Sequence, residues 1–136
     1  MTKDIKLANI RFTKISAERN LDYTGKPSIK PKLNISNIEK LKEGKTEAIS
    51  VYFKFGINYS ELGNIDLEGK IILLMDSKLL KETIKSWDSK TLDNDTHLII
   101  LNIIMQKASL KAIQLEEELG LPLHINIPRL KLNSKK

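Results

Sequence analysis

The chain has 136 residues and no cysteine, and its 23 basic and 17 acidic side chains give a net charge of +6. This length fits one domain with a usable core, and the missing thiols exclude disulfides, thiolate metal sites and thiol catalysis. The polar start, Met1 to Asp4, leads into no signal-peptide run, so we expect a cytoplasmic protein. The longest apolar stretch, Leu98 to Met105, is too short to span a bilayer, so we expect no membrane insertion.

The first half of the chain is rich in alternating apolar residues, which are typical of half-buried strands. A phase switch near Ala8 and Asn9 predicts a bulge in the first strand. Pro31 places the second strand at a sheet edge, because proline cannot donate to a ladder. The four predicted strands are Ile5–Ile15, Ile29–Leu41, Ile49–Tyr59 and Ile65–Met75, and a polar crossover links the first two.

The second half is helical. Ser77 is the expected N-cap of a short helix, Asp95 the expected N-cap of a long one, and Gly120 its expected stop. Strands followed by helices indicate an α+β fold, with a four-stranded antiparallel sheet and one short and one long C-terminal helix packed on one face. We therefore expect one domain, with strands over about 5–75, helices over about 77–120 and an apolar tail over 121–132.

The long helix carries more apolar surface than one small sheet can cover. An apolar seam follows one side of this helix, and the first half is apolar almost all round. We expect self-association there, the alternative being burial by the chain's own loops and short helix. The seam consists of Leu98, Leu101, Met105, Ala108, Ala112, Leu115 and Leu119. The expected oligomer interface consists of Leu98, Ile99, Ile100, Ile103 and Ile104.

Sequence signals for catalytic or metal sites are weak, so we expect that the protein is not an enzyme and has no catalytic residues, cofactor or metal. His97 and His124 lack metal-ligand spacing and are interpreted as surface or cap residues. The run Glu116 to Glu118 is interpreted as a solvated helix face. No serine sits in a nucleophile-elbow setting. Aromatic platforms for nucleic acid are also not expected, because Phe53, Phe55 and Tyr59 share the apolar strand face that should meet the helix.

Apolar residues outside the core are the positive signal. Large exposed apolar patches mark interaction sites, and an exposed strand edge can hold an extended peptide. The apolar residues that do not all fit in one small core are Leu21, Tyr23, Tyr52, Ile72, Leu74, Leu123, Ile125 and Ile127.

This order of parts resembles the SecB family of export chaperones. The most specific stretch is the join of long helix and proline-bounded tail, Ala112 to Pro128, and the start from Ile10 to Ser16 is also similar to the family's first strand. The resemblance covers nearly the whole chain in pattern. It implies a homotetramer built as a dimer of dimers, which binds unfolded or nascent polypeptides in apolar grooves without ATP.

The resemblance also implies which residues line the grooves. By position, the crossover residues Leu21 and Tyr23 and the tail residues Leu123 and Ile125 correspond to groove walls, and two further candidates are Phe12 and Tyr52. SecB proteins dock the motor SecA through an acidic sheet surface. This chain is basic, which argues against SecA as a partner.

The expected function is therefore an ATP-independent holdase, with protein export, antitoxin guarding and general chaperoning left open as its setting. The alternative from another class is a basic RNA- or ribosome-associated module, whose binding would fall steeply with salt. A small-ligand-binding or catalytic domain would need a closed pocket with converging polar groups, which the sequence does not indicate.

Overall fold

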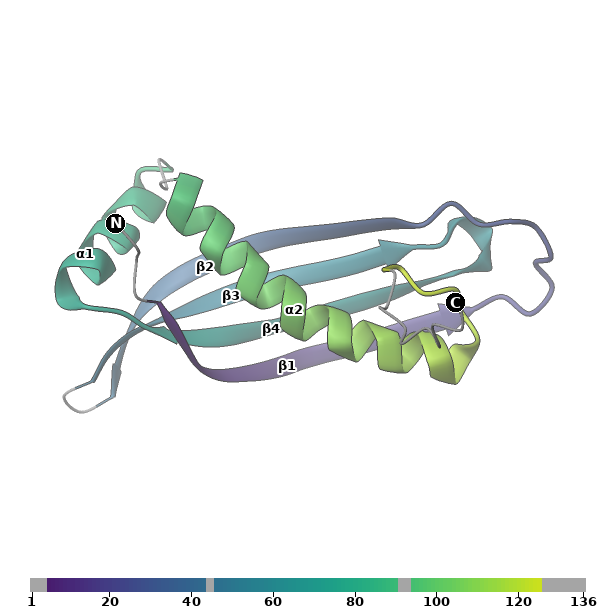
Figure 1. Ribbon diagram of the computed structural model, residues 1–136, viewed down its shortest axis with the longest axis horizontal. Coiled ribbons are helices and arrows are strands. Elements are labelled where there is room, and N and C mark those ends of the chain that lie inside the picture. Colours follow the sequence, from purple (N-terminus) through teal and green to yellow (C-terminus); the bar gives the residue numbers. More distant parts are fainter. Residues whose placement is uncertain (1–4, 44–45, 91–93, 126–136) are drawn as a thin grey trace, which may run out of the picture.

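The computed structural model describes residues 5–43, 46–90 and 94–125. Four antiparallel strands form one sheet in the order β1-β4-β3-β2, and a long and a short helix complete the fold (Figure 1). The predicted α+β class is confirmed. The elements are β1 (Lys6–Arg19), β2 (Lys30–Glu43), β3 (Thr46–Asn58), a 3-10 turn (Ser60–Leu62), β4 (Gly63–Leu74), α1 (Ser77–Asp88) and α2 (Asn94–Leu119).

Strand pairing confirms the local predictions for the edges of the sheet. The register of β1 against β4 shifts between Leu7 and Asn9, which is the predicted bulge, and shifts again between Phe12 and Lys14. Each bulge inserts one residue and turns the following side chains over. The strand that contains Pro31, β2, is an edge strand as expected. Because of the two bulges, residues of both parities in β1 point to the helix-covered face.

The core lies between the sheet and α2. Phe53, Phe55 and Tyr59 are at most 1% exposed, which confirms their interpretation as core residues. From Val51 to Asn58, β3 alternates buried residues with exposed or half-buried ones, so the other face of this part of the strand is turned away from α2. The short helix α1 packs against β2 and β3, with Leu80 and Thr83 buried.

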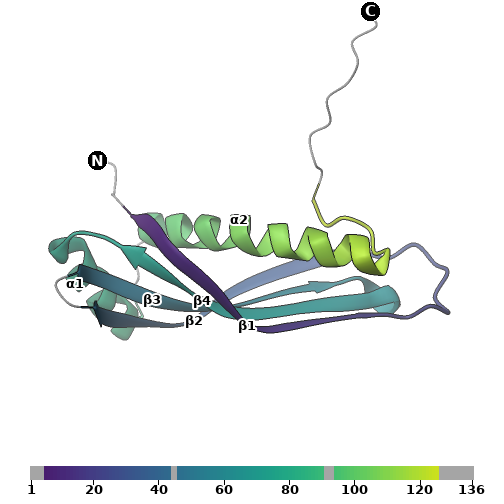
Figure 2. The same ribbon diagram turned by 90° about the horizontal axis from the view of Figure 1, so that it is seen from below.

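The long helix crosses the sheet diagonally, from the β2 side to the β1 side (Figure 1), and forms a second layer above it (Figure 2). One row of its buried residues is spaced by four: Ile100, Ile104, Ala108 and Ala112 are all 0% exposed. A row with this spacing runs obliquely along a helix, which suits an oblique crossing. The two alanines let the backbone of α2 approach the strands closely.

The structure corrects three helix predictions. The predicted seam shares only Ala108 and Ala112 with the buried row, and its first member, Leu98, is 59% exposed. Asp76, not Ser77, is the N-cap of α1, and its carboxylate accepts from the Leu79 N–H at 2.8 Å. The long helix begins at Asn94, so Asp95 lies in its first turn. Gly120 ends α2 as predicted, with a φ of 66° that an L-residue with a side chain rarely adopts.

By length and composition alone, Asp95–Leu119 is also long and apolar enough to cross a membrane. The sequence-based estimate of Leu98 to Met105 as the longest apolar stretch was therefore too short. In the fold, one side of this helix packs on the sheet, as in the core helix of a globular domain. Its other side leaves apolar residues uncovered.

Candidate functional site

Uncovered apolar side chains gather at one end of the molecule. Leu21, in the crossover between β1 and β2, is 83% exposed, and Leu123 and Ile125, in the tail after α2, are 40% and 42% exposed. Ile15, in the second half of β1, is 47% exposed. The crossover, the end of β1 and the tail lie at the same end of the sheet (Figure 1). Exposed apolar groups from three segments thus lie at one end of the sheet, and exposed apolar groups are typical of interaction sites.

Arg19 joins these segments. It is the last residue of β1, and its Nη1 donates to the carbonyl oxygen of Leu119 at 3.1 Å and also to that of Gly120. A cation at a helix C-terminus satisfies free carbonyls and complements the helix dipole. Arg19 therefore fixes the start of the crossover beside the start of the tail. Sequence reasoning did not single out this residue.

Two more of the predicted groove residues lie on the helix-covered side of the sheet. Phe12 is half-buried, and its ring meets Phe53 edge-on with centroids 6.1 Å apart. Tyr23 is half-buried and packs against the core. Both side chains support the fold, and part of each remains accessible.

Tyr52 lies elsewhere. It alternates with the buried residues of β3 and so points away from α2 and the tail. Its hydroxyl donates to Glu39 at 3.4 Å, and the Lys70 ammonium lies 5.9 Å from its ring centroid. The structure therefore does not bring Tyr52 together with Leu21, Leu123 and Ile125.

The predicted oligomer residues also separate into two groups. Ile100 and Ile104 are 0% exposed and belong to the chain's own core, so in this conformation they offer no surface to a second chain. Leu98 is 59% exposed, and Ile99 and Ile103 are half-buried. Of the predicted interface residues, Leu98, Ile99 and Ile103 therefore remain accessible to a second chain.

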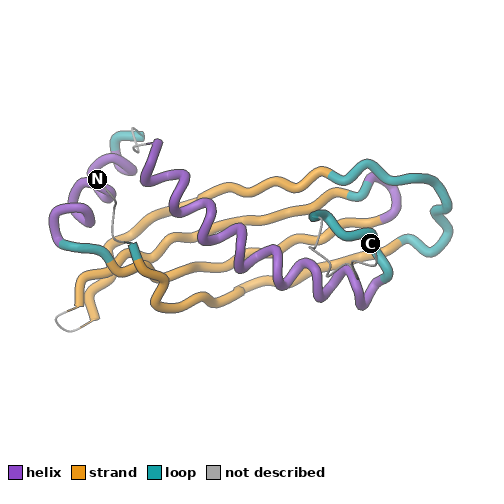
Figure 3. The backbone as a smooth tube through the Cα atoms, in the orientation of Figure 1, coloured by secondary structure: helices purple, strands orange, loops and turns teal. Residues whose placement is uncertain are grey.

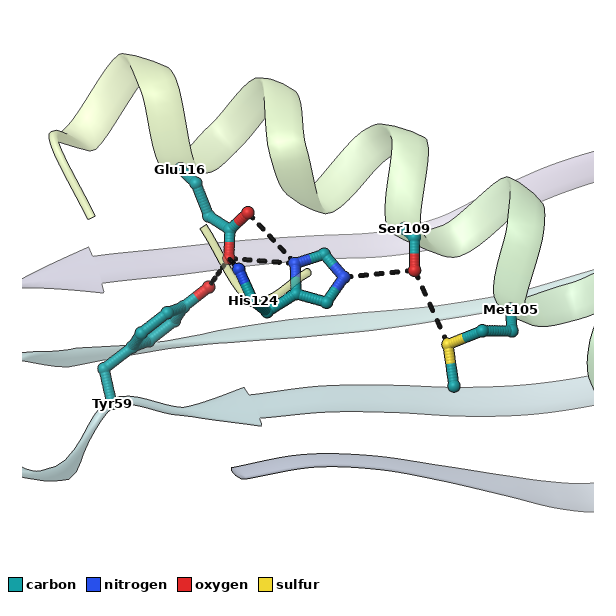
Figure 4. Close-up of polar contacts among 5 residues, drawn as sticks. All are labelled: Tyr59, Met105, Ser109, Glu116 and His124. Atoms are coloured by element: carbon teal, nitrogen blue, oxygen red, sulfur yellow. Dashed lines mark hydrogen bonds and ion pairs between the residues drawn. The ribbon is translucent and has the colours of Figure 1, made fainter. Parts of the chain in front are cut away.

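A buried polar cluster holds the tail against α2 and the sheet (Figure 4). The Glu116 carboxylate accepts from the Tyr59 hydroxyl, from the His124 backbone N–H at 3.0 Å and from His124 Nδ1 at 3.0 Å. The other ring nitrogen, Nε2, lies 3.0 Å from Ser109 Oγ. The side chains of Glu116 and His124 are 0% and 1% exposed. The buried carboxylate is thus hydrogen-bonded rather than left without partners, as burial of a polar group requires.

Burial and the Glu116 carboxylate both raise the pKa of Tyr59. Burial of the phenol raises the pKa of Tyr59 well above its ordinary value, and the hydrogen bond to Glu116 and the negative charge of Glu116 raise it further. The phenol therefore stays protonated and remains a hydrogen-bond donor throughout the neutral range.

Ser109, His124 and Glu116 are connected like a nucleophile, a base and an orienting acid. Their burial argues against that chemistry, because Ser109 is only 6% exposed and lies within α2. The cavities of about 440 and 540 Å³ at the strand ends are lined by other residues, such as Asn58 and Asn64. A nucleophile needs access to substrate and a nearby oxyanion site. The arrangement therefore acts as a clamp between helix, sheet and tail.

Two predictions are wrong at this clamp. Glu116 is buried while Glu117 and Glu118 are exposed, so only part of the acidic run is solvated. His124 is buried rather than a surface or cap residue. The sequence held a signal for Glu116, which continues the four-residue spacing of Ala108 and Ala112. It held no such signal for His124, because alternation with Leu123 and Ile125 would place the histidine outward.

No family model and no curated protein sequence matches the chain. Among solved structures, this chain is similar to the SecB-like chaperone Rv1957 of Mycobacterium tuberculosis, solved in complex with a ChAD peptide from the HigA1 antitoxin. The match covers 93% of this chain and 88% of the Rv1957 chain. Its TM-score is 0.50 at 10% sequence identity.

The fold is SecB-like. A protein of unknown function from Streptococcus agalactiae has a similar fold, with a TM-score of 0.52 at 10% identity, over 95% of this chain and all of its own. At this identity the SecB-like likeness concerns the fold alone. The assignment of function therefore depends on the surface and clamp of this chain.

Within the described residues, no group of three or more His, Asp or Glu is placed to hold a metal ion. Residues 126–132 of the predicted apolar tail, including Ile127, lie outside the described part of the chain.

Proposed function

We propose that this protein is an ATP-independent holdase that binds extended, unfolded polypeptides through the apolar surface at the crossover end. The observation that carries the proposal is the exposure of Ile15, Leu21, Leu123 and Ile125, each 40–83% exposed, on three segments at one end of the sheet. Such a patch is costly on a monomer without a partner. The SecB-like fold supports the proposal, since one solved neighbour is a chaperone in complex with a peptide.

The size of the surface suits transient binding. Complete burial of one large apolar side chain contributes about 1.5–3 kcal/mol, and ordering a disordered client offsets much of the total. A micromolar Kd, which corresponds to about 8 kcal/mol, is the expected affinity for one surface. Several surfaces that act on one long client would bind it more tightly.

Self-association through Leu98, Ile99 and Ile103, as a tetramer in the cytoplasm, is part of the proposal. It would supply several binding surfaces for one client and would cover the apolar outer side of α2. Static light scattering measures the mass directly. A mass of one chain at working concentration would contradict it.

The RNA-binding alternative is less well supported. Phe53 and Phe55 are buried and cannot stack on bases. On the sheet face turned away from α2, Lys14 pairs with Glu68 at 3.7 Å, so basic and acidic groups are interspersed there. This pattern differs from the concentrated basic face of a nucleic-acid binder.

The decisive experiment is fluorescence anisotropy with a labelled, permanently unfolded polypeptide. The native form of the same polypeptide is the control. Micromolar binding of the unfolded form, with little change between low and moderate salt, would support the proposal. Binding of both forms alike, or preference for RNA with a steep loss on adding salt, would overturn it.

A further inference from the structure

The segment from Leu121 to Ile125 is held on the sheet by one buried carboxylate instead of by strand pairing. Leu121 is 5% exposed, and its N–H donates to the Glu116 carbonyl at 2.8 Å. Three residues later, both the N–H and the ring Nδ1 of His124 bind the Glu116 carboxylate. The position of the segment therefore depends on the chemistry of Glu116.

This segment covers a part of the sheet that α2 leaves open. Because α2 crosses diagonally, its C-terminal half lies toward β1, and the chain then turns back over the middle of the sheet beside it (Figures 1 and 3). The His124 ring meets Phe55 of β3 edge-on, with centroids 5.9 Å apart. Phe55 pairs with Leu33 of the edge strand β2, which is half-buried. The surface next to and beneath the segment is thus an apolar strip that ends at a sheet edge.

In this segment the polar side chain is buried and the apolar side chains are exposed, the reverse of the usual arrangement. The imidazole of His124 is buried, whereas Leu123 and Ile125 on either side of it are 40% and 42% exposed. Simple hydrophobic burial would place the leucine and isoleucine inward and the histidine in water. The hydrogen bonds between His124 and Glu116 offset the cost of the observed orientation. Such a buried polar contact fails as a unit once one partner is lost.

We propose that residues 121–125 form a strap, latched by Glu116, that covers the Phe55–Leu33 strip and gives way to an extended apolar segment of an unfolded client. This inference rests on the proposed holdase function and deepens it. With the strap moved aside, the strip joins the surface around Leu21. Leu123 and Ile125 stay available to the client on the released strap. Only molecules with an open strap can bind a client at the strip. The apparent Kd is therefore the intrinsic Kd divided by the open fraction.

Glu116→Gln is the first variant to test. It keeps the shape of the side chain but removes the charge and replaces one acceptor oxygen with a donor, while three donors still point at the group. Glu117→Gln is the matched control, because it makes the same change on the exposed neighbour. His124→Ala is a second variant, which removes the latch from the strap side and leaves the helix unchanged.

Two measurements are made on each variant. Hydrogen exchange followed by mass spectrometry reports opening at 121–125, and unchanged protection in β3 and β4 shows that the fold is intact. Anisotropy with the labelled unfolded polypeptide reports client affinity. We expect both latch variants to exchange faster at 121–125 and to bind the client about tenfold more tightly. Glu117→Gln should match the wild type in both assays.

Exchange at 121–125 that stays at the wild-type rate in both latch variants would overturn the proposal. Faster exchange with equal or weaker client binding would overturn it as well. If the wild type binds the polypeptide and neither latch variant gains affinity, the strap alone is wrong. If the wild type and all variants fail to bind, the holdase function itself is wrong, and the role of the strap falls with it.

Discussion

Replacing Leu21 with serine should weaken client binding more than any other single change at the crossover end. Leu21 is 83% exposed, so nearly all of its side chain is free to be buried by a client. Complete burial of a leucine contributes about 1.5–3 kcal/mol, and scaling by the exposed fraction leaves about 1.2–2.5 kcal/mol. At tenfold per 1.4 kcal/mol, the Kd for an unfolded polypeptide should rise roughly 7- to 60-fold.

Leu123→Ser should have a smaller effect for the same reason. Leu123 is only 40% exposed, which leaves about 0.6–1.2 kcal/mol and roughly a 3- to 7-fold rise in Kd. The control is Leu110→Ser, because Leu110 is 64% exposed on α2 but belongs to neither the predicted groove nor the predicted interface. Fluorescence anisotropy measures all three variants. Wild-type affinity in Leu21→Ser, or an equal loss in Leu110→Ser, would refute the placement of the surface.

Three further predictions concern the clamp and the helix end. Glu116→Ala leaves the Tyr59 hydroxyl and the His124 ring without their shared acceptor, so urea denaturation should show a loss of about 3–5 kcal/mol. The exposed control, Glu117→Ala, should change stability by less than about 0.5 kcal/mol, and equal losses would contradict the clamp. Because the pKa of Tyr59 is raised in the folded state, its contribution to stability is complete below a pH of about 10 and is lost as pH rises further. Tyr59→Phe should therefore flatten the alkaline decline of the urea midpoint, and an unchanged decline would count against the buried phenol. Gly120→Ala should cost about 1 kcal/mol by thermal denaturation, because a φ of 66° strains any residue with a Cβ, and a neutral result would place the end of α2 elsewhere.

The fold could be predicted from the sequence because its signals are local. Alternation with period two places Phe53 and Phe55 on the core face, and the phase switch at Ala8 and Asn9 marks a bulge. Gly120 ends the long helix by the same kind of local chemistry. Each of these properties depends on neighbouring residues, so one chain is enough to show them.

The clamp could not be predicted in this way, because it joins residues that are far apart in the chain. Tyr59 directly follows β3, Glu116 lies on α2 and His124 lies in the tail. A glutamate inside an acidic run normally faces water, and only tertiary contacts reveal that this one is buried. The side of α2 that faces the sheet was also misjudged. The apolar first half offered several equally apolar stripes, and the diagonal crossing selected the one through Ile100 and Ile104.

Light scattering of an aggregating client tests the central claim most directly. A substrate protein is diluted from denaturant into buffer without ATP, in the presence of increasing amounts of this protein. We expect scattering to be suppressed in proportion to the amount added, and Leu21→Ser to require a higher concentration for the same effect. Aggregation at the same rate with and without the wild-type protein would contradict the account.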